Sequence, residues 1–276
     1  MTDSYRPIQL NSWLKSAEDS LKSAGISSAR LDSELIAGFC FGESREWVHG
    51  HPEFQISLAI FGKLTDLLNR RISHEPIAYL LGEKEFYGRC FYVNKNVLVP
   101  RPETESLIEL ALSVNLDRPR LIDIGTGSGN IGISIMLERP KWRAHLTDIS
   151  SRALELTAKN IRQFKLEETI TFRKQNLLRA DDTDYSIVVA NLPYVPDSLS
   201  GSLDLMSEPA ISLFAGNDGL DLYRELFKQI NKRKLKPLHL ITESLVSQHK
   251  DMQEMASRSG YILSKTKGLG QHFVPV

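Results

Sequence analysis

A glycine-rich segment is the first part of the chain whose residue types are suited to chemistry. Residues 123–130 have the sequence DIGTGSGN, between a short apolar run and a helical pattern. Glycines at such a junction let the backbone turn tightly and approach a ligand closely. Residues 127–132 also match GxGxxG, which is weak evidence alone because a bare packing turn uses the same residues. The segment predicts a ligand site at the carboxyl end of a strand.

A carboxylate follows at a suitable spacing. Asp148 ends the next apolar run, 19 residues beyond Gly129. A carboxylate in that position can accept hydrogen bonds from two ribose hydroxyls. The alternative role, a helix cap, can be filled by Ser150 or Ser151. The loop and the carboxylate together predict a cofactor that contains adenosine, without specifying which one.

The sequence Asn191-Leu192-Pro193-Tyr194 follows the apolar run 187–190. An Asn at the end of a buried strand packs poorly, but its side-chain oxygen and the Leu192 carbonyl can both accept from one NH₂ group. Pro193 keeps the preceding residue extended, which directs that carbonyl, and the Tyr194 ring can stack on a planar group. The four residues predict a clamp for an amide or amine, with an ordinary strand-ending turn as the simpler alternative.

Composition limits the class of protein that contains these residues. The 276 residues include 34 Lys and Arg and 34 Asp and Glu, and direct nucleic-acid binding, which favours a basic surface, is not expected. The richest basic stretch, residues 228–236, fits a solvated helix end. No apolar run approaches the roughly 20 residues of a membrane span, and two cysteines suit a reducing compartment. We expect a cytoplasmic monomer without a metal site.

The elements that must position these residues fall into two groups. Helical periodicity predicts a bundle over residues 1–82, with helices at 10–24, 28–41 and 57–72. The residues expected to face inward in the second and third helices are Leu31, Leu35, Phe39, Leu58, Phe61, Leu64, Leu68 and Ile72. No strand-like alternation interrupts this region, and nothing in it suggests chemistry.

The second group begins with aromatic and apolar residues around Gly88-Arg89, which predict a β-hairpin. Short apolar strands then alternate with helical segments, a pattern typical of a parallel sheet covered on both faces. The expected strands are 120–124, 143–148, 169–173, 186–190, 238–242, 261–266 and 273–276. The expected helices are 104–115, 130–138, 151–164, 218–234 and 247–258.

Longer stretches resemble the peptide-chain release factor glutamine methyltransferases. The most specific is VLVPRPETE at residues 97–105, supported by PIAYLLG at 76–82, EFYG at 85–88 and the region 208–223. The similarity runs over nearly the whole chain. It implies an N-terminal helical substrate-recognition domain (1–82), a β-hairpin linker (83–100) and a class I, Rossmann-like methyltransferase domain (101–276) with a mostly parallel sheet and an antiparallel last strand.

The resemblance implies S-adenosyl-L-methionine as the cofactor and a glutamine of a class I release factor, methylated on N5, as the substrate. The residues implied to hold the cofactor are Gly125, Thr126, Gly127, Ser128, Gly129, Asp148, Asn176 and Asn191. Those implied to hold the glutamine are Asn191, Leu192, Pro193 and Tyr194. The family usually has an acidic residue at position 176 and a proline at position 192, and the region around Glu243 also departs from its pattern. An Asn oxygen can still accept from the adenine amine.

The expected mechanism is alignment, because an amide nitrogen is a weak nucleophile and a methyl sulfonium is a strong electrophile. Asn191 and the Leu192 carbonyl would orient the NH₂ group, and no general base is expected. Three alternatives remain open. Asn-Leu-Pro-Tyr also resembles ribosomal-RNA adenine dimethyltransferases, which are not expected to carry the helical domain and the hairpin. The other two are an inactive S-adenosylmethionine-binding module and an oxidoreductase that uses a dinucleotide.

Overall fold

Two units make up the chain in this computed structural model, Met1–Gly82 and Glu83–Val276. The residues that the structure describes are 8–179, 181–182, 184–199, 207–233 and 236–276. None of the helices within these ranges is both long enough and apolar enough to cross a membrane.

The first unit is a helical bundle built on the apolar stripes of its sequence. Its helices are α1 (Leu10–Ser23), α2 (Ala29–Phe41), α3 (Arg45–Gly50), α4 (Leu58–Ile72) and α5 (Ile77–Leu81). In α1 the inward residues are Leu10, Trp13, Ala17 and Leu21, all buried. A pair of two-residue strands, β1 (Ile8–Gln9) and β2 (Gln55–Ile56), is a feature that the sequence pattern does not predict. The short helices α3 and α5 are also not predicted.

The predicted inward face of α2 is wrong. Leu31 and Phe39 are 41% and 52% exposed, whereas Ile36 is fully buried. The physical reason is a buried ion pair, in which Asp32 accepts from Arg71 Nε of α4 at 2.7 Å. This charge-assisted hydrogen bond stabilises the polar side of α2 inside the bundle and leaves the competing apolar stripe at the surface.

The predicted stripe of α4 is inward only in part. Leu64 is buried and Leu68 is half-buried, but Leu58 is 64% exposed. Leu58 directly follows the N-cap Ser57, whose hydroxyl accepts from the backbone N–H of Ile60. The first turn of the helix is therefore fixed by capping and not by burial.

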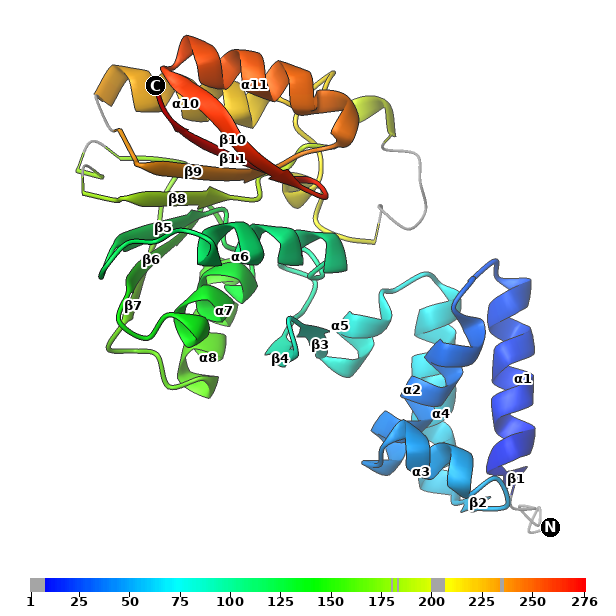
Figure 1. Cartoon of the computed structure of the whole chain (residues 1–276). Helices are drawn as coiled ribbons and strands as arrows, with labels where there is room; N and C mark the ends of the chain where they lie inside the picture. The colour runs from blue at the N-terminus through cyan, green and yellow to red at the C-terminus, as the bar shows by residue number, and fades with distance from the viewer. Residues whose placement is uncertain (1–7, 180, 183, 200–206, 234–235) are drawn as a thin grey trace, which may run out of the picture. The chain divides into compact units, whose positions relative to one another are not determined.

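The second unit is built on one seven-stranded sheet, shown in Figure 1, with the order β10-β11-β9-β8-β5-β6-β7. The parallel strands are β5 (Arg120–Ile124), β6 (Arg143–Asp148), β7 (Ile170–Lys174), β8 (Ile187–Ala190) and β9 (His239–Glu243). The antiparallel pair β10 (Tyr261–Lys267) and β11 (Gly270–Pro275) joins the sheet through β9. The predicted fold class is confirmed, and each parallel strand lies within one residue of its expected bounds.

Helices cover both faces of this sheet (Figure 1). One face packs against α6 (Glu105–Leu112), α7 (Asn130–Glu138) and α8 (Ser151–Gln163), and the other packs against α10 (Asp221–Arg233) and α11 (His249–Arg258). Successive residues alternate between the two cores, so that Leu121 lies in the first and Ile122 in the second. All four residues Ile187 to Ala190 of β8 are buried for this reason.

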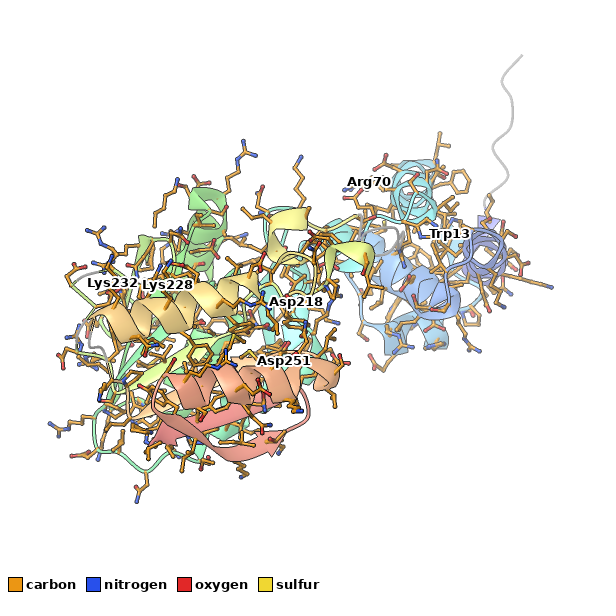
Figure 2. All side chains as sticks on the ribbon, turned by 90° about the horizontal axis from the view of Figure 1, so that it is seen from above. Trp13, Arg70, Asp218, Lys228, Lys232 and Asp251 are labelled. Carbon is orange, nitrogen blue, oxygen red and sulfur yellow. The ribbon has the colours of Figure 1, made fainter. Side chains whose placement is uncertain are left out.

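The described lysines of the basic stretch at the end of α10 are exposed, as predicted for a helix end, while Ile230 between them is buried. Lys228 and Lys232 extend from α10 in Figure 2, and both are exposed. Lys228 pairs with Glu225 on the same helix at 3.5 Å. Residues 234–235 of the predicted stretch lie outside the described residues.

A two-stranded hairpin opens the second unit. It consists of β3 (Glu83–Phe86) and β4 (Arg89–Tyr92), and its turn lies at Tyr87-Gly88, with φ values of 51° and 67°, one residue earlier than predicted. Asn160 of α8 connects the hairpin to the core by hydrogen bonds. Its Oδ1 accepts from Tyr92 N at 2.9 Å, while its Nδ2 donates to Tyr92 O at 3.1 Å and to Ser128 O at 2.8 Å.

We predict that Asn160→Ala lowers the free energy of unfolding of the second unit by about 2–4 kcal/mol, because it leaves partly buried backbone groups of Tyr92 and the buried carbonyl of Ser128 without their Asn160 partner. Equilibrium unfolding in urea measures this change. Gln163→Ala is the matched control, because Gln163 also lies on α8 and donates to the hairpin at Cys90 O, but from an exposed position. Its expected effect is below about 1 kcal/mol. Equal losses in the two variants would contradict the assignment.

Candidate active site

A cavity of about 420 Å³ lies at the carboxyl edge of the sheet. It is lined by the segments that follow β5, β6, β7 and β8 and by two loops, around residues 96–101 and 211–216. Parallel pairing explains why these segments meet, since Ile124 at the end of β5 is in register with Ala190 of β8 and Thr147 of β6. The volume is within the range of small-molecule sites.

The glycine-rich segment after β5 borders this cavity. Gly125 N and Thr126 N donate to one carbonyl oxygen of β6 at 2.8 and 2.9 Å, which ties the turn to the neighbouring strand. Gly125, Gly127 and Gly129 have φ values of 72°, 57° and 84°, which residues with a Cβ rarely adopt. Gly129 does not line the cavity, and a Cβ there would lie 2.9 Å from Ile133 Cδ1. Close packing therefore accounts for Gly129, whereas the other two glycines face the cavity.

Asp123, the residue before Ile124, braces this turn from inside the protein. It is fully buried, and its Oδ2 accepts from Thr126 Oγ1 at 2.6 Å and from Gly132 N at 3.1 Å. Its Oδ1 has no hydrogen-bond partner among the described residues. Burial raises the pKa of Asp123 to about 6, and the bonds from Thr126 and Gly132 oppose this rise. The sequence pattern includes Asp123 in the motif but predicts no such bracing role.

Asp148, at the end of β6, lines the cavity with both of its oxygens partly engaged. Gly127 N donates to Oδ2 at 3.0 Å and Ser150 N donates to Oδ1 at 2.8 Å. Burial raises the pKa of Asp148, and these backbone donors oppose the rise. A carboxylate offers about four acceptor positions, so acceptor capacity remains for a ligand. The cap of α8 is Ser150, whose hydroxyl accepts from Ala153 N.

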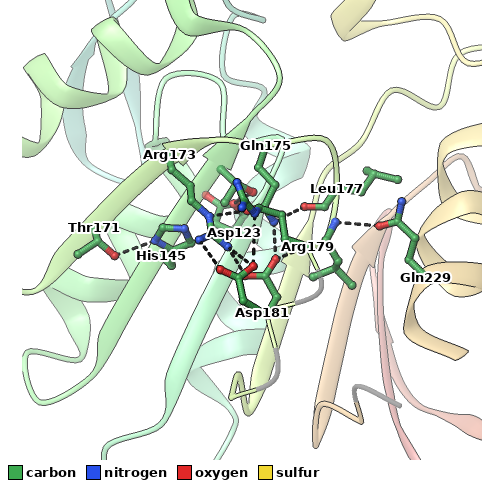
Figure 3. Close-up of polar contacts among 12 residues, drawn as sticks. Asp123, His145, Thr171, Arg173, Gln175, Leu177, Arg179, Asp181 and Gln229 are labelled. Carbon is green, nitrogen blue, oxygen red and sulfur yellow. Dashed lines mark hydrogen bonds and ion pairs between the residues drawn. The ribbon is translucent and has the colours of Figure 1, made fainter. Parts of the chain in front are cut away.

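A polar cluster fixes the segment after β7 that carries Asn176 (Figure 3). Gln175 Oε1 accepts from Arg173 Nε at 2.6 Å. The buried Asp182 accepts from Arg173 Nη2 and from Arg179 N, both at 2.6 Å. Gln175 and Asn176 both line the cavity. The cluster therefore fixes the part of the cavity wall that contains Asn176, through contacts on the side away from the cavity.

Asn191, at the carboxyl end of β8, lines the opposite part of the site. Its Nδ2 donates to Thr104 Oγ1 at 3.1 Å. Thr104 Oγ1 in turn donates to Glu243 Oε1 at 3.1 Å. Glu243 is the last residue of β9 and is 1% exposed. Burial raises the pKa of Glu243, and hydrogen bonds from Tyr194 and Thr104 oppose the rise.

The three residues after Asn191 differ in their surroundings. Leu192 and Pro193 line the cavity, but Tyr194 does not. The Tyr194 hydroxyl donates to Glu243 Oε1 at 2.9 Å, and burial raises the pKa of Tyr194. Leu192 N donates to the hydroxyl of the buried Tyr223 at 3.2 Å. Stacking of the Tyr194 ring on a ligand stays a prediction.

Glu208 connects the two loops that line the cavity. It is buried, and its Oε2 accepts from Val99 N at 2.8 Å. Its Oε1 forms an ion pair with Arg101, which also lines the cavity. A charge-assisted pair that also satisfies a backbone N–H is among the stronger side-chain contacts.

The structure thus brings nine of the predicted site residues to one cavity. They are Gly125, Thr126, Gly127, Ser128, Asp148, Asn176, Asn191, Leu192 and Pro193. Sequence reasoning assigned no role to four residues with specific contacts there: Thr104, Asp123, Glu208 and Glu243. A usable signal existed for Asp123 and Glu243, as acidic residues near the ends of predicted parallel strands. Within the described part of the chain no group of three His, Cys, Asp or Glu residues is placed to bind a metal.

Comparison with known proteins finds two matched regions of the chain. The PrmC N-terminal domain family matches residues 12–82, and the methyltransferase small domain family matches residues 104–206. The chain is 33% identical to the release factor glutamine methyltransferase of Coxiella burnetii, over 84% of each chain. It is 34% identical to the protein of that name from Leptospira interrogans, over 87% of each chain.

A solved structure resembles the chain at the level of the fold. The hMettl16 catalytic domain, crystallised with a MAT2A 3′UTR hairpin, aligns with a TM-score of 0.54 and 16% identity, over 76% of this chain and 79% of that chain. At this identity the likeness concerns the arrangement of strands and helices.

We predict that Gly219→Ala destabilises the protein strongly. Gly219 has a φ of 77°, and a Cβ there would lie 2.1 Å from Tyr194 O, so the backbone of the Asn191–Tyr194 segment would have to move. The expected loss in the free energy of unfolding exceeds about 3 kcal/mol, measured in urea.

Gly260→Ala is the control for this prediction. Gly260 has a φ of 80° and no atom within 4 Å of the added Cβ. Only the backbone strain then remains, about 1–2 kcal/mol. A loss at Gly219 no larger than that at Gly260 would show that the close approach to Tyr194 has no energetic consequence.

Proposed function

The chain belongs to the release factor glutamine methyltransferases, and we propose that it transfers a methyl group from S-adenosyl-L-methionine to the side-chain amide nitrogen, N5, of a glutamine in a class I peptide-chain release factor. The single observation that carries the proposal is the presence of the glycine loop and the Asn191 carboxamide on one cavity. A nucleotide-type cofactor site and a clamp for an NH₂ group are the two parts that such a reaction needs.

The residues of the cavity fit S-adenosylmethionine, which supplies a methyl group bonded to a positively charged sulfur. Asp148 keeps acceptor capacity for the ribose hydroxyls beside its two backbone donors. The positive φ values of Gly125 and Gly127 permit a close approach of the ligand to the backbone. The Asn176 side-chain oxygen is suited to accept from the adenine amine. We assign cofactor binding to the segment Gly125 to Gly129 with Asp148, Asn176 and Asn191, with Gly129 acting through packing.

The glutamine amide requires orientation, because its nitrogen lone pair is delocalised into the carbonyl. Asn191 Oδ1 and the Leu192 carbonyl are the two acceptors assigned to its NH₂ group, with Pro193 and Tyr194 shaping the clamp. Two acceptors on one nitrogen direct its lone pair away from them and stabilise positive charge as it develops on that nitrogen. Holding both reactants in line contributes on the order of 7–11 kcal/mol to lowering the barrier.

No side chain is assigned as a general base. The amide N–H becomes far more acidic once the nitrogen carries a fourth bond, so the proton can leave for water after the methyl group has arrived. Asp123 and Glu243 are buried carboxylates that contact the glycine turn and Thr104, and neither lines the cavity. Their contacts support a role in bracing the site.

The remaining assignments concern the partner. A glutamine side chain is too small to identify a protein, so we assign recognition of the rest of the release factor to residues 1–82 and its orientation to the hairpin segment 83–100. Translation termination places this activity in the cytoplasm. The zero formal net charge supports a protein substrate over direct nucleic-acid binding, and we propose that the enzyme acts as a monomer.

Incubation with labelled S-adenosylmethionine and purified release factor tests the function. We expect label on one glutamine-containing tryptic peptide, with a gain of about 14 Da, the mass of a methyl group in place of hydrogen. Ribosomal RNA in a parallel reaction should stay unlabelled. Label on the RNA and none on the protein would reverse the assignment in favour of an adenine methyltransferase, and no transfer to either would favour an inactive binding module.

Two variants test the division of roles within the cavity. Asn191→Ala should reduce turnover by at least about 100-fold with cofactor affinity within severalfold, because the glycine loop stays intact. Asp148→Asn should weaken cofactor binding by about 10-fold or more, because its NH₂ group would face a backbone N–H donor. Calorimetric titration with the cofactor and single-turnover kinetics separate the two effects. Equal losses of cofactor affinity in both variants would contradict this division.

A further inference from the structure

We propose that Thr104 and Glu243 are positioning residues that hold the Asn191 carboxamide with its oxygen toward the substrate nitrogen. The proposal rests on the function given above, because it concerns how the clamp for the glutamine NH₂ group is oriented. It assigns roles to the threonine of the VLVPRPETE segment and to the last residue of β9.

The direction of the hydrogen bonds follows from the chemistry of Glu243, the last group in the series that runs from Asn191 through Thr104. The Glu243 carboxylate can only accept, and its Oε1 receives Thr104 Oγ1 at 3.1 Å and the Tyr194 hydroxyl at 2.9 Å. A hydroxyl has one hydrogen, so Thr104 has none left to donate to a second partner. Toward Asn191 the Thr104 oxygen must therefore accept, and Asn191 Nδ2 lies 3.1 Å from it.

This chain of bonds selects one of the two orientations of the carboxamide. An Asn side chain has nearly the same shape after a flip that exchanges its oxygen and nitrogen. A flipped Asn191 would place Oδ1 against the Thr104 oxygen with no hydrogen between them, and would leave a buried acceptor unpaired. It would also present NH₂ to the substrate NH₂, donor against donor. The unflipped orientation presents Oδ1, which is the acceptor that the clamp requires.

The burial of Glu243 supports a role beyond stability. Its residue exposure is 1%, and its Oε2 has no hydrogen-bond partner among the described residues. A buried carboxylate with an unsatisfied oxygen is destabilising in itself. Its other oxygen, however, serves both Thr104 and Tyr194, the residues on either side of the clamp. One acceptor thereby fixes the hydroxyl that faces Asn191 and the ring that ends the Asn191–Tyr194 segment.

The decisive variants change the hydroxyl of Thr104 and little else. Thr104→Val replaces the hydroxyl by a methyl group of similar size, and Thr104→Ser restores a hydroxyl. Thr242→Val is the matched control, because Thr242 is a buried threonine beside Glu243 whose Oγ1 has no hydrogen-bond partner in the described structure. Methylation of the release factor is followed in all three variants and in the unaltered enzyme.

Thr104→Val is expected to lower kcat by about 10- to 100-fold, because a freely flipping clamp misaligns the amide. The KM for the release factor and the cofactor affinity should stay within about threefold, while the thermal midpoint should fall by a few degrees, because the buried Glu243 carboxylate loses one of its two side-chain donors. Thr104→Ser should recover kcat to within about threefold of the unaltered enzyme, and Thr242→Val should leave all four quantities unchanged. A purely structural Thr104 would instead spread its effect over KM, cofactor affinity and kcat.

The acceptor at position 243 gives a second, independent comparison. Glu243→Gln keeps a side-chain oxygen for Thr104 and Tyr194, so its kcat should fall by less than about 10-fold. Glu243→Leu removes the acceptor, so its kcat should fall at least as far as that of Thr104→Val.

The outcomes separate this proposal from the proposed function. Full kcat in Thr104→Val, or an equally low kcat in Thr104→Ser, overturns the orienting role while the enzyme still labels the release factor. An unaltered enzyme that leaves the release factor unlabelled overturns the proposed function and this role together.

Discussion

The parallel pairing of β5 through β9 is the constraint on which the site depends. Hydrogen bonding in register brings the carboxyl ends of five strands to one edge, and each end there contributes a polar side chain or a glycine turn. Strands β6 and β7 contribute Asp148 and the Asn176 segment, while β8 and β9 contribute Asn191 and Glu243. Since both faces of the sheet are covered by helices, this edge is where loops are free to form a cavity.

Much of the fold was predictable because its signals are local. The run Ile187 to Ala190 is apolar at every position, as a strand buried on both faces must be. The inward face of α2 was not predictable, because its pattern contains two apolar stripes. The choice between them depends on the ion pair from Asp32 to Arg71, which are 39 residues apart. Local periodicity contains no information about a partner at that distance.

The residues of the site likewise divide into those that local sequence predicts and those that it does not. The glycine loop, Asp148 and Asn191 are recognisable from residue type and spacing, but the contacts of Thr104 span 87 residues to Asn191 and 139 to Glu243. Position 192 shows what a departure from the usual pattern does. Proline has no backbone N–H, whereas Leu192 donates one to the Tyr223 hydroxyl. Leucine at this position therefore has a backbone hydrogen bond that proline cannot form.

Asn160 connects the hairpin directly to the glycine-rich loop through its side-chain hydrogen bonds. One side chain joins both backbone groups of Tyr92 to the carbonyl of Ser128, which lines the cavity. The hairpin cannot slide along α8 without breaking these bonds or pulling on the glycine turn. A force applied to β4 thus reaches the ligand-facing backbone through the Asn160 carboxamide, in addition to the bonds that hold the glycine turn to β6 and to Asp123.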